Sequence, residues 1–260
     1  MLNLLRARLN QGHRTLDFPR SASPLPERYR GMPHVDPAKC ADGCRACADA
    51  CPVDAISVGA QGQRPDPRID LGSCVFCADC VQACPTSALR YTQEFRMAAR
   101  TRQDLVVGAE GMKLAQALDA KSRALFGRSL KLRQVSAGGC NGCEVEVNVL
   151  GTIVFDIVRF GIQMVASPRH ADGLLITGPV TRNMRLALQK TYDAVPGPKL
   201  VIAVGGCAIS GGPFRDHPQV TNGADATLPV DLYVPGCPPH PLTILDGLLR
   251  LLGRIEEGKR

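Results

Sequence analysis

Cysteine is the residue type most able to do chemistry in this sequence. The 260-residue chain contains twelve cysteines, whose thiolates can bind metal, pair as disulfides or act as nucleophiles. Arg6 and Arg8 interrupt the N-terminal leucines, and no short apolar core with a cleavage site follows, so we expect no signal peptide. In the reducing compartment that this implies, the cysteines are expected to be metal ligands rather than disulfide partners.

Eight of the cysteines lie in an internal repeat. The segment Cys44–Ile56, which reads Cys-x2-Cys-x3-Cys-Pro, recurs as Cys77–Leu89. Three thiolates spaced by two residues can surround one corner of an iron–sulfur cubane, whereas a fourth, placed three residues later and before proline, reaches a second cluster. Residues 40–91 therefore predict a two-cluster unit with pseudo-symmetric halves.

The expected ligands cross between the two halves. One cluster takes Cys40, Cys44, Cys47 and Cys84, and the other takes Cys74, Cys77, Cys80 and Cys51. The first half departs from the pattern, because three residues separate Cys40 from Cys44. Gly43 lies in this gap and can adopt a left-handed backbone, so we expect the extra residue to be accommodated.

The other four cysteines need a scaffold that brings distant segments together. Residues 129–260 alternate short apolar runs with helical stretches, which indicates a parallel sheet. The expected strands are 131–136, 173–177, 199–204 and 231–234, and the expected helices are 143–160, 181–190 and 241–252. The cysteines follow three of these strands at their carboxyl ends, where such sheets bind cofactors: Cys140, Cys143, Cys207 and Cys237.

Glycines are concentrated in the same loops, and they permit the backbone to approach a cluster closely: Gly138, Gly139, Gly142, Gly205, Gly206, Gly211, Gly212 and Gly236. The twelve cysteines thus divide into three sets of four, which predicts three [4Fe-4S] clusters. Two alternatives are zinc sites, which need neither the third thiol nor the Cys-Pro of each repeat, and a role for Cys207 and Cys237 as small buried residues.

The charge balance agrees with bound clusters. The formal net charge is +7, and three clusters of about −2 each would leave the loaded protein near neutral. The sequence has no Trp, four Tyr and no basic stripe interleaved with aromatics, which argues against nucleic-acid binding. No apolar run reaches the roughly 18 residues of a membrane-spanning helix.

Two further stretches carry no metal ligand. Residues 1–39 are basic and proline-rich, with a possible short helix at 1–10 that places three leucines on one face. That face suits a membrane surface or a partner, although a frayed terminus and an organellar transit peptide are alternatives. Residues 92–128 are expected to form a helical linker, with a helix from Met112 to Phe126 that Gly127 ends.

Several motifs resemble those of known families. Residues 40–91 resemble the two-cluster bacterial ferredoxin domain, and the preceding Arg28–Pro33 is similar to the approach to that domain in subunits of complex I and related hydrogenases. From 128 onward the chain resembles the small electron-transferring subunit of membrane-bound group 4 [NiFe] hydrogenases of the formate hydrogenlyase or hydrogenase-4 type. Its motifs are Gly139–Glu144, Pro168–Asp172, Thr177–Asn183, Gly206–Gly212 and Val234–Pro239.

These resemblances imply an α/β fold in which a ferredoxin-like α+β domain precedes a flavodoxin-like parallel-sheet domain. They also imply an oxidoreductase subunit without catalytic residues of its own, fused from two subunits that are usually separate. The implied partners are a [NiFe] hydrogenase large subunit, membrane-arm subunits and an electron donor or acceptor such as a ferredoxin or a formate dehydrogenase subunit. The implied location is cytoplasmic, peripheral on the inner face of the cell membrane.

A complex I-like subunit that relays electrons to quinone is the nearest alternative. The corresponding complex I subunit has two adjacent cysteines at the first position of this motif, whereas two residues separate Cys140 from Cys143 here. The spacing therefore resembles the hydrogenase branch.

A few residues beyond the ligands are candidates for function. Glu144 and Glu146 are expected either to relay protons near the cluster or to stabilise a helix N-terminus. His170 is expected to cap a loop or to order the surroundings of a ligand, and Thr177–Thr181 to contact the cluster or the partner. The apolar residues Ile153, Ile157, Phe160 and Met164 are expected to lie in the core.

Overall fold

A five-stranded parallel sheet forms the C-terminal half of the computed structural model, which describes residues 2–21, 25–59 and 65–255. Its strand order is β10-β9-β8-β6-β7, and every neighbouring pair is parallel. The strands are β6 (Leu130–Ser136), β7 (Ile162–Met164), β8 (Gly173–Thr177), β9 (Leu200–Val204) and β10 (Leu232–Val234).

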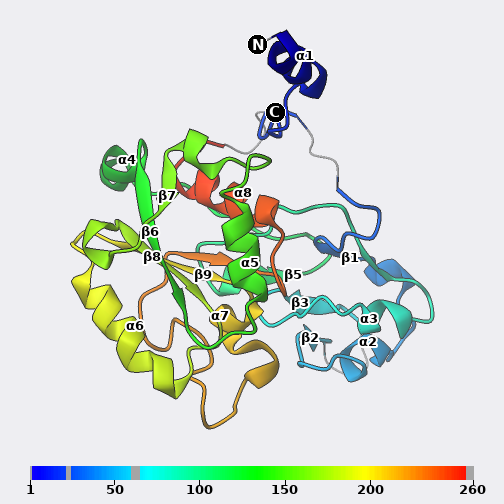
Figure 1. Ribbon diagram of the computed structural model, residues 1–260. Coiled ribbons are helices and arrows are strands. Elements are labelled where there is room, and N and C mark those ends of the chain that lie inside the picture. The colour runs from blue at the N-terminus through cyan, green and yellow to red at the C-terminus, as the bar shows by residue number, and fades with distance from the viewer. Residues whose placement is uncertain (1, 22–24, 60–64, 256–260) are drawn as a thin grey trace.

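Helices cover both faces of this sheet (Figure 1). Because strand side chains alternate between faces, Leu175 joins the apolar cluster that includes α5 (Gly142–Val149) and α8 (Pro241–Leu251). Ile176 joins the other cluster, which includes Leu188 of α6 (Arg182–Ala194). All five residues of β8 and of β9 are buried, as expected for parallel strands covered on both sides. The α/β prediction is confirmed.

The four strands expected from the sequence agree with β6, β8, β9 and β10 to within one residue at each end. Strand β7 was not expected; it is three residues long and lies at the edge of the sheet. So short a run has too few positions to show a period.

The single helix expected over 143–160 is wrong. Helix α5 ends at Val149, and the chain continues through turns to the 3-10 helix η3 (Ile157–Phe160). Asp156 has a left-handed backbone (φ 44°) that no continuous right-handed helix allows. The core positions expected for this stretch are only partly confirmed. Ile157 is buried, whereas Ile153 and Met164 are 64% and 36% exposed.

The cysteine repeat folds into two short helices and two small antiparallel sheets. The helices are α2 (Ala46–Asp49) and α3 (Asp79–Gln82), which contact one another. One sheet pairs β1 (Pro33–Val35) with β4 (Leu89–Tyr91), and the other has the order β2-β3-β5, with β2 (Ile56–Ser57), β3 (Arg68–Asp70) and β5 (Val106–Val107). Short 3-10 helices flank them: η1 (Pro37–Lys39) and η2 (Gln103–Leu105).

The linker helix is much shorter than expected. Helix α4 spans Ala120–Phe126. Asp119 caps its N-terminus, because its carboxylate accepts hydrogen bonds from the amides of Lys121 and Ser122. Residues 112–119 instead run without helix along the C-terminal half, where Leu118 donates its amide to Leu251. Ala115 and Leu118 of the expected helix are buried, whereas Leu125 is 60% exposed.

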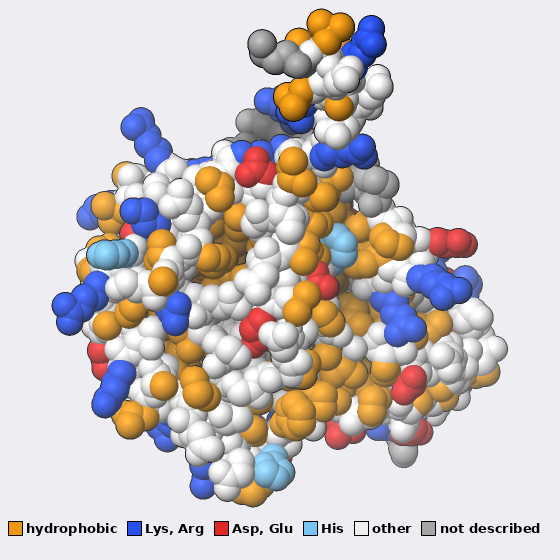
Figure 2. All heavy atoms as spheres, in the orientation of Figure 1, with side chains coloured by type: hydrophobic (Ala, Val, Ile, Leu, Met, Phe, Trp, Pro, Cys, Tyr) orange, Lys and Arg blue, Asp and Glu red, His pale blue; other side chains and the backbone are white. Residues whose placement is uncertain are grey.

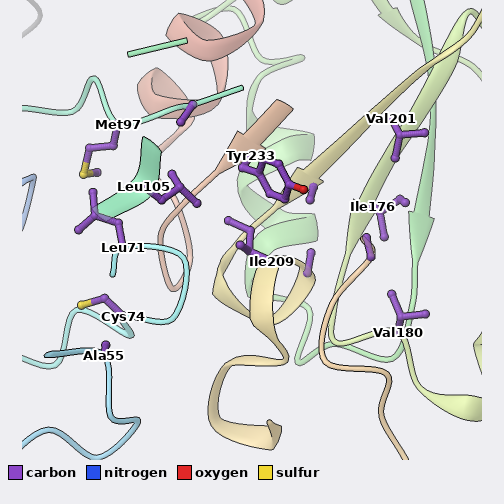
Figure 3. Close-up of a cluster of buried hydrophobic side chains, with 14 of the residues drawn as sticks. Ala55, Leu71, Cys74, Met97, Leu105, Ile176, Val180, Val201, Ile209 and Tyr233 are labelled. Carbon is purple, nitrogen blue, oxygen red and sulfur yellow. The ribbon is translucent and has the colours of Figure 1, made fainter. Parts of the chain in front are cut away.

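One apolar core joins the cysteine repeat to the sheet. Leu71, Cys74, Met97 and Leu105 belong to the same buried cluster as Ile176 and Val201 of the sheet, with Ile209 and Tyr233 between them (Figure 3). Ala99 and Tyr233 also exchange backbone hydrogen bonds. The two parts are therefore packed together rather than merely tethered.

Helix α1 (Leu2–Gln11) confirms the expected N-terminal helix. It stands away from the body of the molecule (Figure 1), and none of its residues is buried. Leu2, Leu5 and Leu9 are 60% to 81% exposed. Within the residues that the structure describes, no helix has the length and apolar character needed to cross a membrane.

Candidate iron–sulfur sites

A cavity in the N-terminal half is walled by four cysteines. Cys51, Cys74, Cys77 and Cys80 line it together with Val53, Ile56, Ile69, Val75 and Tyr91. Cys51 belongs to the first half of the repeat and the other three to the second, as in the crossed set. Soft thiolate donors around an apolar cavity of this kind fit an iron–sulfur cluster.

The thiols of this set are held close enough to oppose one another's ionisation. Burial raises the pKa of Cys80 to about 12, with further contributions from the charges of Cys74, Cys77 and Cys51. Burial likewise raises the pKa of Cys74 to about 11. Four thiolates are therefore unfavourable together without a positive centre, which bound iron supplies.

The two Cys-Pro turns present their sulfurs to backbone amides. The third residue after each cysteine is left-handed, with φ 49° at Asp54 and 52° at Ser87. This reversal lets the next amide donate back to the sulfur, over 3.2 Å from Ala55 to Cys51 Sγ and over 3.2 Å from Ala88 to Cys84 Sγ. Such N–H···S bonds stabilise thiolate ligands and tune a cluster.

Three of the remaining cysteines of the repeat lie in its first half. Burial raises the pKa of Cys47, and the charges of Cys40 and Cys44 raise it further, so these three thiols are neighbours. Cys47 also interacts with Cys80, which places the two sets side by side. The assignment of Cys84 to this first set remains a prediction from the repeat. Gly43 is left-handed (φ 70°), as expected for the longer gap.

The last four cysteines converge at the carboxyl edge of the parallel sheet. Cys140 follows β6, Cys143 lies in the first turn of α5, and Cys207 lies in α7 (Gly206–Ser210) after β9. Cys237 follows β10. Burial raises the pKa of Cys143, and so do the charges of Cys207, Cys237 and Cys140. Cys140 and Cys237 are exposed.

Glycine backbone forms the inner wall of this third site. Gly205 has φ 92°, and a Cβ there would lie 2.4 Å from Cys143 Sγ. A Cβ on Gly212 would lie 3.0 Å from Cys207 Sγ. A cradle that only glycine permits, beside four convergent thiols, fits a cluster that the backbone approaches closely. Among the residues that the structure describes, no three His, Cys, Asp or Glu side chains are arranged around a point suited to a single metal ion.

Both halves of the chain match the profiles of known protein families. The profile of the family "NADH ubiquinone oxidoreductase, 20 Kd subunit" matches residues 140–251, and that of the "4Fe-4S dicluster domain" matches residues 29–88. Formate hydrogenlyase subunit 7 of Escherichia coli is 48% identical over 130 residues, which are 50% of this chain and 51% of that protein. The probable membrane-bound hydrogenase subunit mbhJ of Pyrococcus furiosus is 43% identical over 50% of this chain and 78% of its own length.

The chain belongs to this family of NADH ubiquinone oxidoreductase subunits. An NADH-quinone oxidoreductase subunit of Bacteroides thetaiotaomicron is also similar, with 44% identity over 50% of this chain and 66% of that protein. The chain thus joins a 4Fe-4S dicluster domain to a C-terminal domain of this family, and it is an oxidoreductase subunit. It spans about half the length of the formate hydrogenlyase relative.

Glu144 is the most constrained acid of the C-terminal domain. It is 6% exposed and accepts hydrogen bonds from Ser136 Oγ (2.6 Å) and Thr177 Oγ1 (2.7 Å). Burial raises its pKa, but the two hydroxyls outweigh burial and hold the pKa below its usual value. Glu144 is therefore a fixed negative charge beside Cys143.

The other candidates are less constrained. Burial raises the pKa of Glu146. His170 lies exposed in η4 (Pro168–His170), where its side chain makes no hydrogen bond with the described residues and so caps no loop among them. The loop that begins at Thr177 lies against the loop of Cys140, since a Cβ on Gly178 would meet Gly139 N at 2.5 Å.

Side-chain hydrogen bonds to backbone carbonyls, and close backbone packing, link the dicluster domain to the C-terminal domain beside the cysteines. Ser210 Oγ donates to Gly72 O over 2.9 Å, and a Cβ on Gly206 would lie 3.5 Å from Cys74 O. Arg215, after η5 (Gly212–Phe214), donates to Val53 O over 3.2 Å. The loops of the second cysteine set therefore pack directly on the helix that carries Cys207.

Sequence patterns gave no sign of the residues that hold the Gly72 loop in place beside this interface. Asp70 and Arg102 form a two-pronged ion pair that also engages Ser73 and the amide of Gly72. Their spacing in the chain follows no motif, so no sequence signal pointed to them. Tyr91, which lines the cavity, was equally unmarked.

Proposed function

We propose that this chain relays electrons through three [4Fe-4S] clusters, to or from the nickel–iron site of a separate large subunit in a membrane-associated [NiFe] hydrogenase of the formate hydrogenlyase type. The observation that carries the proposal is the convergence of the cysteines into separate groups, the second packed against the third. The hydrogenase relatives of the C-terminal domain support it.

We assign the ligands as the sequence predicts. The first cluster takes Cys40, Cys44, Cys47 and Cys84, the second takes Cys51, Cys74, Cys77 and Cys80, and the third, proximal cluster takes Cys140, Cys143, Cys207 and Cys237. When bound, such clusters supply one-electron oxidation and reduction. The chain itself holds the sulfurs, donates amide hydrogen bonds to them and keeps the sites at fixed separations.

The packing supports an order for the three sites. The second set contacts the first through Cys47 and Cys80 and contacts the helix of the third through Gly206 and Ser210. The first set lies at one end of the row and the third at the other. We propose that the donor or acceptor docks at the first set and that the large subunit covers the third.

Surface composition around the third set agrees with a covering partner. Cys140 and Cys237 are exposed, and so is Val145, two residues after Cys143 in α5. On the face that Figure 2 shows, uncharged and hydrophobic side chains with a few acids occupy the middle, and most lysines and arginines lie toward the edge. Apolar area of this kind is typical of the buried centre of a protein interface.

We further propose a cytoplasmic location on the inner face of the cell membrane, with membrane-arm subunits among the partners. A ferredoxin or a formate dehydrogenase subunit would be the donor or acceptor. The exposed leucines of α1, with Arg6 and Arg8 beside them, suit a membrane surface. We also retain the division into an extension (1–39), a ferredoxin domain (40–91), a linker (92–128) and a domain of the hydrogenase small-subunit type (129–260).

A complex I-like role is the second candidate, because the Bacteroides NADH-quinone oxidoreductase subunit is 44% identical over 50% of this chain. The two-residue gap between Cys140 and Cys143 favours hydrogenase. Anaerobic purification of the chain with its bound polypeptides separates the two. We expect a large subunit that contains nickel and a complex that reduces viologen with hydrogen; a nickel-free complex that reduces quinone would favour the alternative.

A further inference from the structure

The segment Tyr29–Gly31, just before the cysteine repeat, touches two cluster loops at once. None of its residues is a cysteine, so it supplies no proposed cluster ligand. Its neighbours come from distant parts of the chain, because Arg30 reaches the Cys74–Cys80 loop and Tyr29 reaches the residue that begins α8.

Arg30 holds two carbonyls of the second cluster's loop. Its Nη1 donates to Phe76 O over 2.8 Å and to Cys77 O over 2.9 Å. Phe76 and Ala78 are left-handed, with φ 55° and 77°, a conformation that brings Cβ too close to the following carbonyl in every residue other than glycine. The Arg30 contacts therefore stabilise a stretch of loop that its own backbone preference opposes.

The first half of the repeat has glycine at the corresponding left-handed position. There Gly43 takes the left-handed position directly before Cys44, and glycine adopts it without steric cost. The second half has Phe76 at the matching place before Cys77 and is held from outside by Arg30. This difference between the halves explains why the Arg30 hydrogen bonds are needed only at the second site.

Tyr29 contacts the loop that follows Cys237. Its ring lies edge-on to His240, with centroids 5.3 Å apart and planes at 72°. His240 follows Cys237 by three residues and caps α8 by accepting the Leu242 amide at Nδ1. A second ring, Phe155, lies 6.2 Å from His240, so the imidazole is fixed between two aromatic side chains.

Gly31 anchors the segment to the chain that follows strand β4. Its amide donates to Thr92 O over 2.9 Å, and the Met32 amide donates to Glu94 O over 2.7 Å. A Cβ on Gly31 would lie 2.3 Å from Glu94 O, so no other residue fits without displacing this backbone. The positions of Tyr29 and Arg30 are thereby set by the chain next to them.

We propose that residues 29–31 form a positioning clip that ties the Cys74–Cys80 loop to the loop after Cys237, with Arg30 as the positioning residue of the second cluster. The proposal rests on the function proposed above. The clip keeps the second and third sites at a fixed separation. Arg30 also adds a positive charge beside the second site, which favours the reduced cluster.

The test compares Arg30→Met, Arg30→Lys and Arg28→Met in the full chain prepared anaerobically with its clusters. Arg28 is the matched control, since it lies just before the segment, is exposed and makes no hydrogen bond or ion pair with the described residues. The readouts are the rate of iron loss to a ferrous chelator and the midpoint potentials from EPR-monitored redox titration.

We expect Arg30→Met to release the iron of one cluster several-fold faster than the wild type and to lower one midpoint potential while the other two stay unchanged. Arg30→Lys should restore most of that midpoint, because it keeps the charge. Arg28→Met should match the wild type. The clip is contradicted if Arg30→Met behaves like Arg28→Met in a protein that holds its clusters, whereas a wild-type chain that binds little iron would contradict the proposed function itself.

Tyr29→Ala examines the other contact. Loss of the ring against His240 should weaken the magnetic interaction between clusters in the fully reduced protein without loss of iron. An unchanged interaction spectrum would show that Tyr29 does not fix the two loops relative to one another.

Discussion

The hydroxyl of Ser210 donates a hydrogen bond to the carbonyl oxygen of Gly72 over 2.9 Å. Ser210 ends the helix that carries Cys207, and Gly72 lies two residues before Cys74, so this bond joins the loops of two cysteine sets. Ser210 is 7% exposed. The separation of the second and third sites is therefore fixed by buried contacts within one chain.

Replacement of Ser210 by Ala should loosen that junction. It leaves the Gly72 carbonyl without its buried donor, which costs about 1–2 kcal/mol. We expect a lower unfolding temperature and slower electron transfer between the second and third clusters, measured by rapid-freeze EPR after partial reduction. Ser57→Ala is the control, since Ser57 is exposed and its hydroxyl has no partner among the described residues. Equal behaviour of the two variants would contradict a role for the Ser210 bond.

Gly205→Ala should remove the proximal cluster. The new Cβ would lie 2.4 Å from Cys143 Sγ, and the backbone there has φ 92°. Iron per chain should fall by about four atoms, the content of one cubane, with the two clusters of the repeat retained. Gly59→Ala is the control, because nothing lies within 4 Å of a Cβ at that position. Full iron content in Gly205→Ala would show that the cluster does not sit against this glycine.

The Asp70–Arg102 pair should contribute to stability more than surface pairs do. The side chains are 27% and 26% exposed, and both hold the loop that leads to Cys74. A double-mutant cycle with Asp70→Asn and Arg102→Met should give a coupling of about 2 kcal/mol in denaturant unfolding. The same cycle on the exposed pair Arg68–Glu110 should give a much smaller coupling, because solvent screens exposed charges. Similar couplings for the two pairs would refute the assignment.

Glu144→Gln should raise the midpoint potential of the proximal cluster. The carboxylate is a buried negative charge that contributes to the raised pKa of Cys143, and a negative charge disfavours the more negative, reduced cluster. Gln keeps an oxygen that can accept from Ser136 and Thr177. Glu146→Gln, two residues along the same helix, should have a smaller effect. A midpoint that falls or stays constant in Glu144→Gln would contradict this electrostatic role.

The sequence predicted the parts of the molecule that depend on local pattern. The Cys-x2-Cys spacings place thiols in tight loops, and buried runs such as Gly173–Thr177 could be assigned as strands because both faces are apolar. Since the carboxyl ends of parallel strands share one edge, the convergence of Cys140, Cys207 and Cys237 also followed.

Features that depend on contacts between distant residues could not be predicted in this way. The segment 112–119 has helical spacing, but hydrogen bonds to Ala98 and Leu251 hold it in a non-helical path. Arg30 binds backbone carbonyls, which every residue carries, so nothing in the sequence identifies Phe76 and Cys77 as its partners. The interface around Gly72 and Ser210 is invisible for the same reason.

Spin quantitation of the fully reduced, anaerobically prepared chain, with parallel iron and sulfide analysis, tests the central claim most directly. We expect about twelve iron atoms per chain and three reduced [4Fe-4S] clusters, of which Cys237→Ala removes one. A chain with little iron, or one that remains EPR-silent on reduction, would contradict the three-cluster relay.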